Sequence, residues 1–292
     1  MPHLRSLKAQ FHVDLNAIYG KEEVSVFFHL LLEHHLNLDK VNYALNPSTE
    51  LSQKQYQYFL EALSQLKQEM PIQYIIGQTE FYGLQFRVNE HVLIPRPETE
   101  ELVDLIVQSI KPAKRLRILD IGTGSGCIAI SLAKQLTNAE VYAMDVSNEA
   151  LEMAKANALE NDVDVTFYNM DILQWKSNKS FFDDIQFDVI VSNPPYVRQF
   201  EKAQMRNNVL SHEPHLALFV EDTDPLVFYR AICELAVDKL VPGGELYFEI
   251  NQYLGSDMQG LLENFSFKNT TLKKDFLGNH RFIVGQFNKE ED

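Results

Sequence analysis

One stretch organises this chain: Phe187-Asp188-Val189-Ile190-Val191-Ser192-Asn193-Pro194-Pro195-Tyr196. Its β-branched apolar run predicts a strand that is buried on both faces, and the two prolines, which have no N–H to donate, must end that strand. They also fix φ at two successive residues, so the Asn193 amide, the Pro194 carbonyl and the Tyr196 ring have little freedom left to lose on binding. The stretch therefore predicts a rigid site at a strand tip; the alternative is an ordinary strand-ending turn, because Asn-Pro often opens turns.

Strand and helix patterns alternate on both sides of this stretch. We expect seven strands, with helices between them except between the last two, and the clearest helices after Ser147 and near 225–240. The strands are expected at 116–121, 140–145, 165–171, 187–193, 244–250, 267–274 and 281–287. Such alternation predicts an α/β fold with a doubly wound, mostly parallel sheet, whose ligands bind beyond the carboxyl ends of the strands. The last two strands have no helix between them and share the turn Gly278-Asn279, so they are predicted to form an antiparallel hairpin at one side of the sheet.

The first 70 residues carry a different pattern. Apolar residues recur there at helical spacing, and breaks at Gly20 and at Asn46-Pro47-Ser48 divide them into a small helical bundle. From Pro71 to Val92 the apolar residues alternate instead, starting at Ile72, which predicts a short β-hairpin between two domains. The segment 93–100 that follows is stiff and acidic, and we expect it either to begin a capped helix at a domain boundary or to line a cleft between the domains.

Composition excludes several classes of function. The chain has 292 residues, of which 45% are hydrophobic, and 26 Lys and Arg against 41 Asp and Glu give a net charge of −15. That charge disfavours stable binding to nucleic acid, which depends on phosphate contacts. Two cysteines, Cys127 and Cys233, are too few for a zinc cluster, and we expect no metal. No apolar run is long enough for a membrane span and no signal pattern opens the chain, so the cytoplasm is the expected compartment.

A glycine loop follows the first expected strand. Gly122, Thr123, Gly124, Ser125 and Gly126 lead directly into a helix, where glycines let a ligand approach the backbone at a helix amino terminus. A dinucleotide-binding loop would need its third glycine at the next position, which is a cysteine.

Carboxylates end the next two strands. Asp145 follows the loop by about twenty residues, where its carboxylate can accept hydrogen bonds from both hydroxyls of a ribose. Asp171 and Ile172 lie at the end of the third strand, where they could contact an adenine. Each carboxylate has the alternative of being an ordinary strand-end turn residue. The loop and Asp145 together favour an adenosine-bearing cofactor, and the loop spacing favours S-adenosyl-L-methionine over a nicotinamide.

The opening stretch then acquires a chemical role. It ends the fourth strand, expected beside the first, so Asn193 should lie next to the methyl donor. If the Asn193 side-chain oxygen and the Pro194 carbonyl each accept one N–H of a planar NH2 group, its nitrogen is held toward the methyl and its developing charge is stabilised. Tyr196 can stack on the same planar group. We expect no metal and no strong base in this chemistry, because solvent can take the proton.

At these residues the chain resembles class I S-adenosylmethionine-dependent methyltransferases, and Asn193 to Tyr196 resemble the group that methylates planar nitrogens. Further motifs are similar to the HemK/PrmC family: Pro71-Ile72-Gln73-Tyr74-Ile75-Ile76-Gly77, Phe81-Tyr82-Gly83, Ile94-Pro95-Arg96-Pro97-Glu98-Thr99-Glu100, Glu213-Pro214, Leu240-Val241-Pro242-Gly243-Gly244, and Asp275 with Gly278 and Arg281. The resemblance implies methylation of the glutamine amide in the Gly-Gly-Gln motif of peptide chain release factors.

It also implies a three-part chain: a helical substrate-binding domain at 1–72, a hairpin linker at 73–95 and a seven-stranded methyltransferase domain at 96–292. By the same resemblance, Gly122 to Gly126, Asp145, Ile172 and Asn193 would bind the cofactor, and Asn193, Pro194, Pro195 and Tyr196 would bind the glutamine.

Three alternatives stay open at this point. The acceptor can be a glutamine of a ribosomal protein, or the exocyclic amine of a nucleic acid, against which the net charge argues. The third is a cofactor-binding scaffold without turnover. Two positions depart from the family pattern, Asn251 and Pro225, each standing where a glycine is usual; both are expected to lie outside the proposed chemistry and to affect loop geometry.

Overall fold

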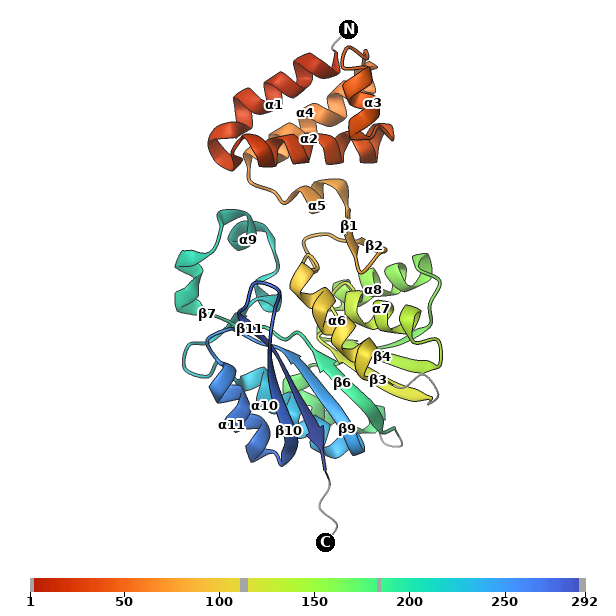
Figure 1. Ribbon diagram of the computed structural model, residues 1–292, viewed down its shortest axis with the longest axis vertical. Helices are drawn as coiled ribbons and strands as arrows, with labels where there is room; N and C mark the ends of the chain where they lie inside the picture. Colours follow the sequence, from red (N-terminus) through yellow and green to blue (C-terminus); the bar gives the residue numbers. More distant parts are fainter. Residues whose placement is uncertain (1–2, 111–114, 183–184, 289–292) are drawn as a thin grey trace. The chain divides into compact units, whose positions relative to one another are not determined.

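The computed structural model describes residues 3–110, 115–182 and 185–288. The chain divides into two compact units (Figure 1). The first comprises Met1–Gly77 together with Arg206–His212, and the second comprises Gln78–Met205 together with Glu213–Asp292. Each unit has its own hydrophobic core.

The first unit is helical. Gly20 separates the first two long helices, and Ser52 caps the third with a capping box completed by Gln55, whose side chain accepts from the Ser52 backbone N–H. Phe11, Phe28 and Phe59 meet at the centre of the core. Its helices are α1 (Leu4–Tyr19), α2 (Lys21–Leu36), α3 (Lys40–Leu45), α4 (Gln53–Lys67), α5 (Ile72–Ile76) and the distant α9 (Asn207–His212).

The second unit is built on a seven-stranded sheet with the order β10-β11-β9-β6-β3-β4-β5. The five strands from β9 to β5 are parallel, and β10 and β11 add an antiparallel hairpin at one edge. The strands are β3 (Leu116–Ile121), β4 (Ala139–Asp145), β5 (Val165–Asn169), β6 (Phe187–Ser192), β9 (Leu240–Glu249), β10 (Phe267–Lys274) and β11 (His280–Phe287). The predicted doubly wound α/β fold, its seven strands and its edge hairpin are confirmed.

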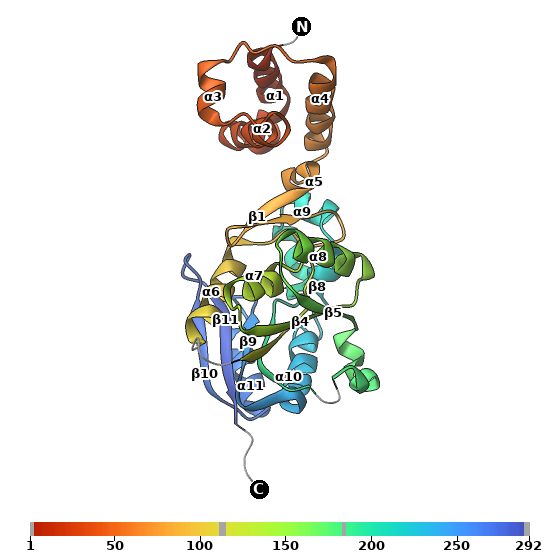
Figure 2. The same cartoon turned by 90° about the vertical axis from the view of Figure 1, so that its right-hand side faces the viewer.

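Helices cover both faces of this sheet (Figures 1 and 2). Alternate residues of each strand face opposite cores: Val189 and Val191 contribute to the core beneath α6 and α7, whereas Ile190 belongs to the core beneath α10 and α11. The helices of this unit are α6 (Pro97–Ser109), α7 (Cys127–Gln135), α8 (Asn148–Glu160), α10 (Val227–Lys239) and α11 (Gly255–Asn264), with the 3-10 segments η1 (Ile172–Phe182), η2 (Gln199–Gln204) and η3 (His215–Ala217).

Two short strand pairs complete the second unit. The hairpin of β1 (Gln78–Phe81) and β2 (Leu84–Arg87) is antiparallel, and β7 (Val197–Arg198) pairs in parallel with β8 (Phe219–Val220). The alternation that predicts a strand from Ile72 onward is wrong, because Ile72–Ile76 forms α5 and ends at Gly77 in the left-handed conformation. A five-residue segment is too short to separate a period of two from one turn of helix.

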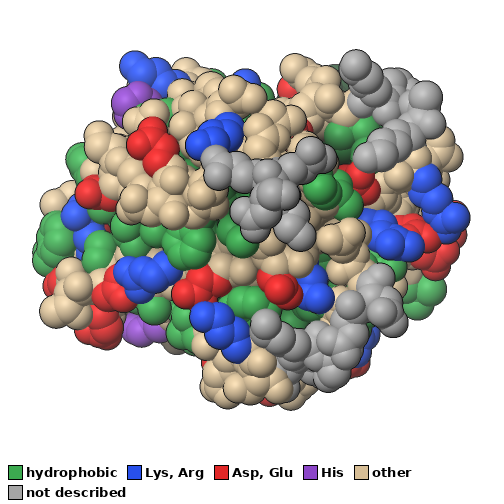
Figure 3. All heavy atoms as spheres, turned by 90° about the horizontal axis from the view of Figure 1, so that it is seen from below, with side chains coloured by type: hydrophobic (Ala, Val, Ile, Leu, Met, Phe, Trp, Pro, Cys, Tyr) green, Lys and Arg blue, Asp and Glu red, His purple; other side chains and the backbone are tan. Residues whose placement is uncertain are grey.

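The surface agrees with the acidic composition. On the face shown in Figure 3, Lys and Arg side chains are interspersed with Asp and Glu, so the described residues form no continuous basic surface there. Every helix in the described part of the chain is too short or too polar to span a lipid bilayer.

Candidate active site

The glycine loop forms the turn between β3 and α7. Gly122, Gly124 and Gly126 all have φ between +55° and +82°, a region that other residues rarely adopt. A Cβ at Gly122 or Gly124 would meet no atom within 4 Å, so the space beside the loop is open. At Gly126 a Cβ would lie 2.8 Å from Ile130 Cδ1, so this glycine serves the packing of the helix instead. The loop thus presents backbone to a pocket while its last glycine joins it to the core.

Asp145, at the end of β4, holds the loop from the neighbouring strand. Its Oδ2 accepts a hydrogen bond from Gly124 N at 2.8 Å, and its Oδ1 accepts one from Ser147 N at 3.0 Å. Burial raises the pKa of this carboxyl group, and these N–H donors oppose the rise. A carboxylate oxygen can accept more than one hydrogen bond, so Asp145 keeps acceptor capacity for a ligand with adjacent hydroxyls.

Asp171 and Ile172 follow β5. The Asp171 carboxylate accepts from Leu173 N at 2.9 Å and from the Gln174 side chain at 3.1 Å, so it shapes the start of η1. Both residues line the same pocket as the glycine loop and Asp145. The carboxyl ends of three adjacent parallel strands, β3, β4 and β5, therefore supply one pocket, as the doubly wound fold predicts.

The tip of β6 completes this pocket. Because β6 pairs with β3 in parallel, with Ser192 opposite Ile121, Asn193 begins the next turn beside the glycine loop. The pocket is lined by Asn193, Pro194 and Pro195. It is also lined by every residue that the sequence predicts to bind the cofactor, except Gly126. Tyr196 is not among the described residues that line the pocket, and its hydroxyl donates to Glu249 Oε1 at 3.0 Å. The predicted stacking role of the Tyr196 ring remains a prediction.

The segment before α6 forms another wall of the pocket. Leu93, Pro95 and Arg96 line it, and the Arg96 guanidinium donates to the buried Glu213 carboxylate at 2.6 Å. Glu213 also accepts from Ile94 N at 3.3 Å, so one carboxylate fixes this segment in two places. The sequence predicts this segment either at a domain boundary or in a cleft between domains; the structure places it in the pocket of the sheet unit.

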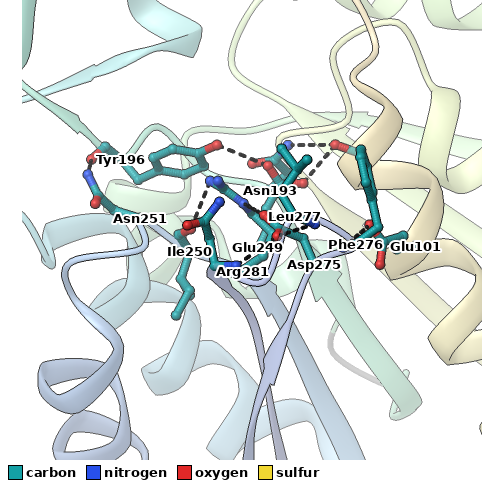
Figure 4. Close-up of polar contacts among 12 residues, drawn as sticks. Glu101, Asn193, Tyr196, Glu249, Ile250, Asn251, Asp275, Phe276, Leu277 and Arg281 are labelled. Carbon is teal, nitrogen blue, oxygen red and sulfur yellow. Dashed lines mark hydrogen bonds and ion pairs between the residues drawn. The ribbon is translucent and has the colours of Figure 1, made fainter. Parts of the chain in front are cut away.

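Two residues of the site have no assigned role in the sequence prediction. Thr99 lies in the first turn of α6, and Glu249 is the last residue of β9 and only 1% exposed. The Thr99 hydroxyl donates to Glu249 Oε2 at 2.7 Å, and Asn193 Nδ2 donates to Thr99 Oγ1 at 3.3 Å. Figure 4 shows Asn193, Tyr196 and Glu249 together at the strand ends. A carboxylate directly after the apolar run Leu246–Phe248 is the signal that marks Glu249 in the sequence.

Asn251 contacts the backbone at the end of the β6 tip. Its side-chain amide donates to the Tyr196 carbonyl at 3.2 Å and to the Glu201 carboxylate at 3.0 Å, while its oxygen accepts from Tyr253 N at 3.0 Å. Its φ is not among the positive values of the described residues, so this position does not require a glycine. Asn251 is not among the described pocket-lining residues, and it holds the backbone at the end of the β6 tip, so its expected effect on loop geometry alone stays a prediction.

Comparisons with known proteins agree with this arrangement. The family model described as Methyltransferase small domain matches residues 99–216, and the one described as PrmC N-terminal domain matches residues 15–77. Among solved structures, a methyltransferase from Pyrococcus furiosus is 18% identical, with a TM-score of 0.51 over 82% of this chain and 100% of that chain. This likeness supports the fold alone.

Two curated relatives match nearly the whole chain. The release factor glutamine methyltransferase of Flavobacterium psychrophilum is 52% identical over 287 residues, covering 97% of this chain and 99% of the relative. That of Bacteroides thetaiotaomicron is 46% identical over 284 residues, covering 96% of this chain and 99% of the relative. Both matches cover nearly the full length of this chain and of each relative. The chain therefore belongs to the family of release factor glutamine methyltransferases.

Proposed function

We propose that this protein transfers a methyl group from S-adenosyl-L-methionine to the side-chain amide nitrogen of the glutamine in the Gly-Gly-Gln motif of peptide chain release factors. One observation carries the chemical part of this proposal: the acceptor groups at the tip of β6 line the same pocket as the glycine loop and Asp145. The acceptor's identity is supported by the two relatives that match nearly the whole chain.

The pocket residues fit the cofactor by their chemistry. Gly122 and Gly124 leave room for a ligand to lie against the loop backbone, and Asp145 offers partly buried carboxylate oxygens to the ribose hydroxyls. We assign the adenine to the neighbourhood of Asp171 and Ile172, where an apolar side chain and a carboxylate lie together. When bound, S-adenosylmethionine supplies an electrophilic methyl group on a positively charged sulfur.

The tip of β6 makes the glutamine nitrogen ready to react. In our proposal Asn193 Oδ1 and the Pro194 carbonyl each accept one N–H of the amide. An amide nitrogen is a poor nucleophile because its lone pair is delocalised. Two acceptors that form hydrogen bonds with its N–H groups stabilise the positive charge that develops on the nitrogen as the N–C bond forms. The prolines hold both acceptors before the substrate arrives, and solvent takes the released proton.

The helical part of the chain has a proposed role in binding the release factor. We propose the division into residues 1–72 for substrate binding, 73–95 as a linker that contains the β1–β2 hairpin, and 96–292 for methyl transfer. Deletion of residues 1–72 is expected to reduce turnover of a whole release factor while leaving the affinity for S-adenosylmethionine unchanged. An equal loss of cofactor affinity would contradict this division of labour.

Mass spectrometry of a purified release factor tests the proposed function. After incubation with the enzyme and S-adenosylmethionine, the peptide that contains Gly-Gly-Gln should gain the mass of one methyl substitution on its glutamine. A release factor with asparagine at that glutamine is the control and should gain none. Ribosomal proteins offered side by side separate the two glutamine acceptors: methylation of a ribosomal protein in place of the release factor would overturn the assignment.

A further inference from the structure

A chain of hydrogen bonds joins the β6 tip to α6 and β9. It runs from Asn193 Nδ2 to Thr99 Oγ1 at 3.3 Å, from Thr99 Oγ1 to Glu249 Oε2 at 2.7 Å, and from the Tyr196 hydroxyl to Glu249 Oε1 at 3.0 Å. Thr99 is 3% exposed and Glu249 is 1% exposed, so water does not compete for these bonds. Glu249 is brought here because β9 lies next to β6, with Phe248 opposite Ser192.

The direction of these bonds follows from the number of protons. Both oxygens of Glu249 accept here, one from the Thr99 hydroxyl and one from the Tyr196 hydroxyl, so the hydroxyl proton of Thr99 is committed to Glu249. Thr99 Oγ1 then has only lone pairs left for Asn193, and the amide must turn its NH2 group toward it. The Asn193 oxygen consequently faces the other way. The carboxylate thus decides which end of the Asn193 amide is available to a ligand.

That choice matters for the proposed reaction. A glutamine NH2 group needs acceptors, and an Asn193 side chain turned by half a rotation about its last bond would present a second NH2 group to it. Two donors facing each other cannot form a hydrogen bond, and each would be left unsatisfied in a buried place. The two orientations have the same shape, so packing alone does not distinguish them.

We propose that Thr99 and Glu249 are positioning residues that orient the Asn193 amide for methyl transfer, with Glu249 holding Tyr196 through its other oxygen. This inference rests on the proposed function, because it assigns the residues that make the acceptor site competent. Thr99 and Glu249 act through Asn193 and touch no reacting atom. The charged groups near Glu249 are Arg281 on β11 and Glu98 on α6, and only Arg281 favours the ionised carboxylate.

Arg281 is itself held in place. Its Nε donates to Asp275 Oδ2 at 3.1 Å, and Asp275 is buried in the turn between β10 and β11. Figure 4 shows this pair beside Glu249. Burial is the largest effect and raises the pKa of Glu249 above its ordinary value, while the hydrogen bonds from Thr99 and Tyr196 and the charge of Arg281 limit the rise. The edge hairpin therefore contributes a positive charge to the chain of hydrogen bonds.

Substitutions that change one hydrogen bond at a time test the proposal. Thr99→Val keeps the shape of the side chain and removes its hydroxyl, so kcat should fall about tenfold or more while the dissociation constant for S-adenosylmethionine stays the same. Thr99→Ser restores the hydroxyl and should recover most of kcat. Glu249→Gln must donate to one of the two hydroxyls and should also lower kcat. In the Glu249→Gln background, Thr99→Val should cost less than it does alone.

Tyr229→Phe provides the matched control. The Tyr229 hydroxyl is buried and donates to the backbone oxygen of Glu249 at 3.0 Å, so its loss perturbs the same residue without touching the chain of hydrogen bonds. We expect it to change stability and leave kcat unaltered. The proposal is overturned if Thr99→Val keeps the wild-type kcat, if Thr99→Ser does not recover activity, or if Tyr229→Phe lowers kcat as much as Thr99→Val.

The same measurements separate this inference from the proposed function. A wild-type enzyme that does not methylate the Gly-Gly-Gln glutamine contradicts the function itself. An active wild-type enzyme with an equally active Thr99→Val variant contradicts only the positioning role. If Thr99→Val does not fold, the comparison of Thr99→Ser with Glu249→Gln decides: a high kcat in the first and a low kcat in the second support the role, and equal values overturn it.

Discussion

Two neighbouring turns in the sheet unit hold the two halves of the site by opposite means. The turn after β3 is rich in glycine and offers backbone groups beside open space. The Asp145 carboxylate, at the end of the next strand, accepts a hydrogen bond from Gly124 N and holds the turn in place. The turn after β6 has prolines, and its amide side chain is bonded to one buried hydroxyl, which is itself bonded to a carboxylate. Both turns lie at the carboxyl ends of adjacent parallel strands.

The difference follows from what each turn has to recognise. A bulky charged cofactor can be bound by many weak contacts along a backbone, so the first turn needs room and positive φ angles. An NH2 group that must react in one direction needs two acceptors at fixed positions, so the second turn needs rigidity. We therefore expect changes in the first turn to affect binding and stability, and changes in the second to affect turnover.

The largest expected effect belongs to the second turn. Asn193→Ala removes an acceptor that holds the reacting nitrogen, so kcat should fall on the order of a thousandfold, while the thermal midpoint stays close to that of the wild type. Initial rates of release factor methylation measure this change. Asn264→Ala, at the exposed end of α11, is the control. An unchanged kcat in Asn193→Ala would remove this residue from the mechanism and erase the contrast between the turns.

A matched pair of glycines tests the role of crowding in the first turn. Gly126 and Gly77 have nearly the same backbone angles, φ and ψ of 82° and 8° against 80° and 7°. A Cβ at Gly126 would meet Ile130 at 2.8 Å and Ala154 at 3.1 Å, whereas at Gly77 it would meet nothing within 4 Å. Both alanine variants bear a strain of about 1–2 kcal/mol, and overpacking at Gly126 adds about 1–3 kcal/mol.

Chemical denaturation followed by circular dichroism compares the two glycines. Gly126→Ala should lower the free energy of unfolding clearly more than Gly77→Ala. Equal losses would mean that the backbone angle alone explains the glycine at 126, and that the loop is less tightly joined to α8 than its short contacts indicate.

Asp145→Ala should affect binding of the cofactor more than the chemical step. The carboxylate loses its bonds to the ribose hydroxyls and its bond to Gly124 N, and hydrogen bonds to a charged group contribute about 1.5–3 kcal/mol. The dissociation constant for S-adenosylmethionine, measured by calorimetry, should rise about ten- to hundredfold. At saturating cofactor kcat should be nearly restored. A dissociation constant equal to that of the wild type would break the ribose assignment.

The smallest expected effect is the pH dependence of cofactor binding. The pKa of Asp120 is raised to about 7, mainly by burial and to a smaller extent by the charge of Asp145, against the hydrogen bonds from Thr123 and the Ala129 backbone. A positively charged ligand nearby favours the ionised carboxylate and lowers this pKa, so binding releases a proton. The affinity should therefore weaken as pH falls through about 7, by at most about tenfold per pH unit.

Calorimetry in two buffers with different ionisation enthalpies detects the released proton. The apparent binding enthalpies should differ for the wild type and agree for Asp120→Asn, which has no proton to release. Equal enthalpies for the wild type at pH 7 would show that Asp120 keeps one protonation state throughout binding.

The sequence predicts much of this molecule because the information is local. The seven strands follow from periodicity, and the order of β6 and β3 follows from the topology that alternating strands and helices allow. The glycine loop, Asp145 and the Asn193 tip are each contained in a few consecutive residues. The one clear error, at Ile72–Ile76, lies in a segment of five residues whose pattern fits a strand and a helical turn equally well.

What the sequence by itself determined is which chemical groups this protein can offer: a glycine loop before a helix, carboxylates at strand ends, and an amide between a buried strand and two prolines. What only the tertiary structure decided is which way that amide faces. Thr99 and Glu249 are 150 residues apart, and Asn193 lies 94 residues from Thr99, so no local pattern connects them. They meet because parallel strands bring their carboxyl ends to one edge of the sheet, where both oxygens of the buried Glu249 accept hydrogen bonds from hydroxyl groups.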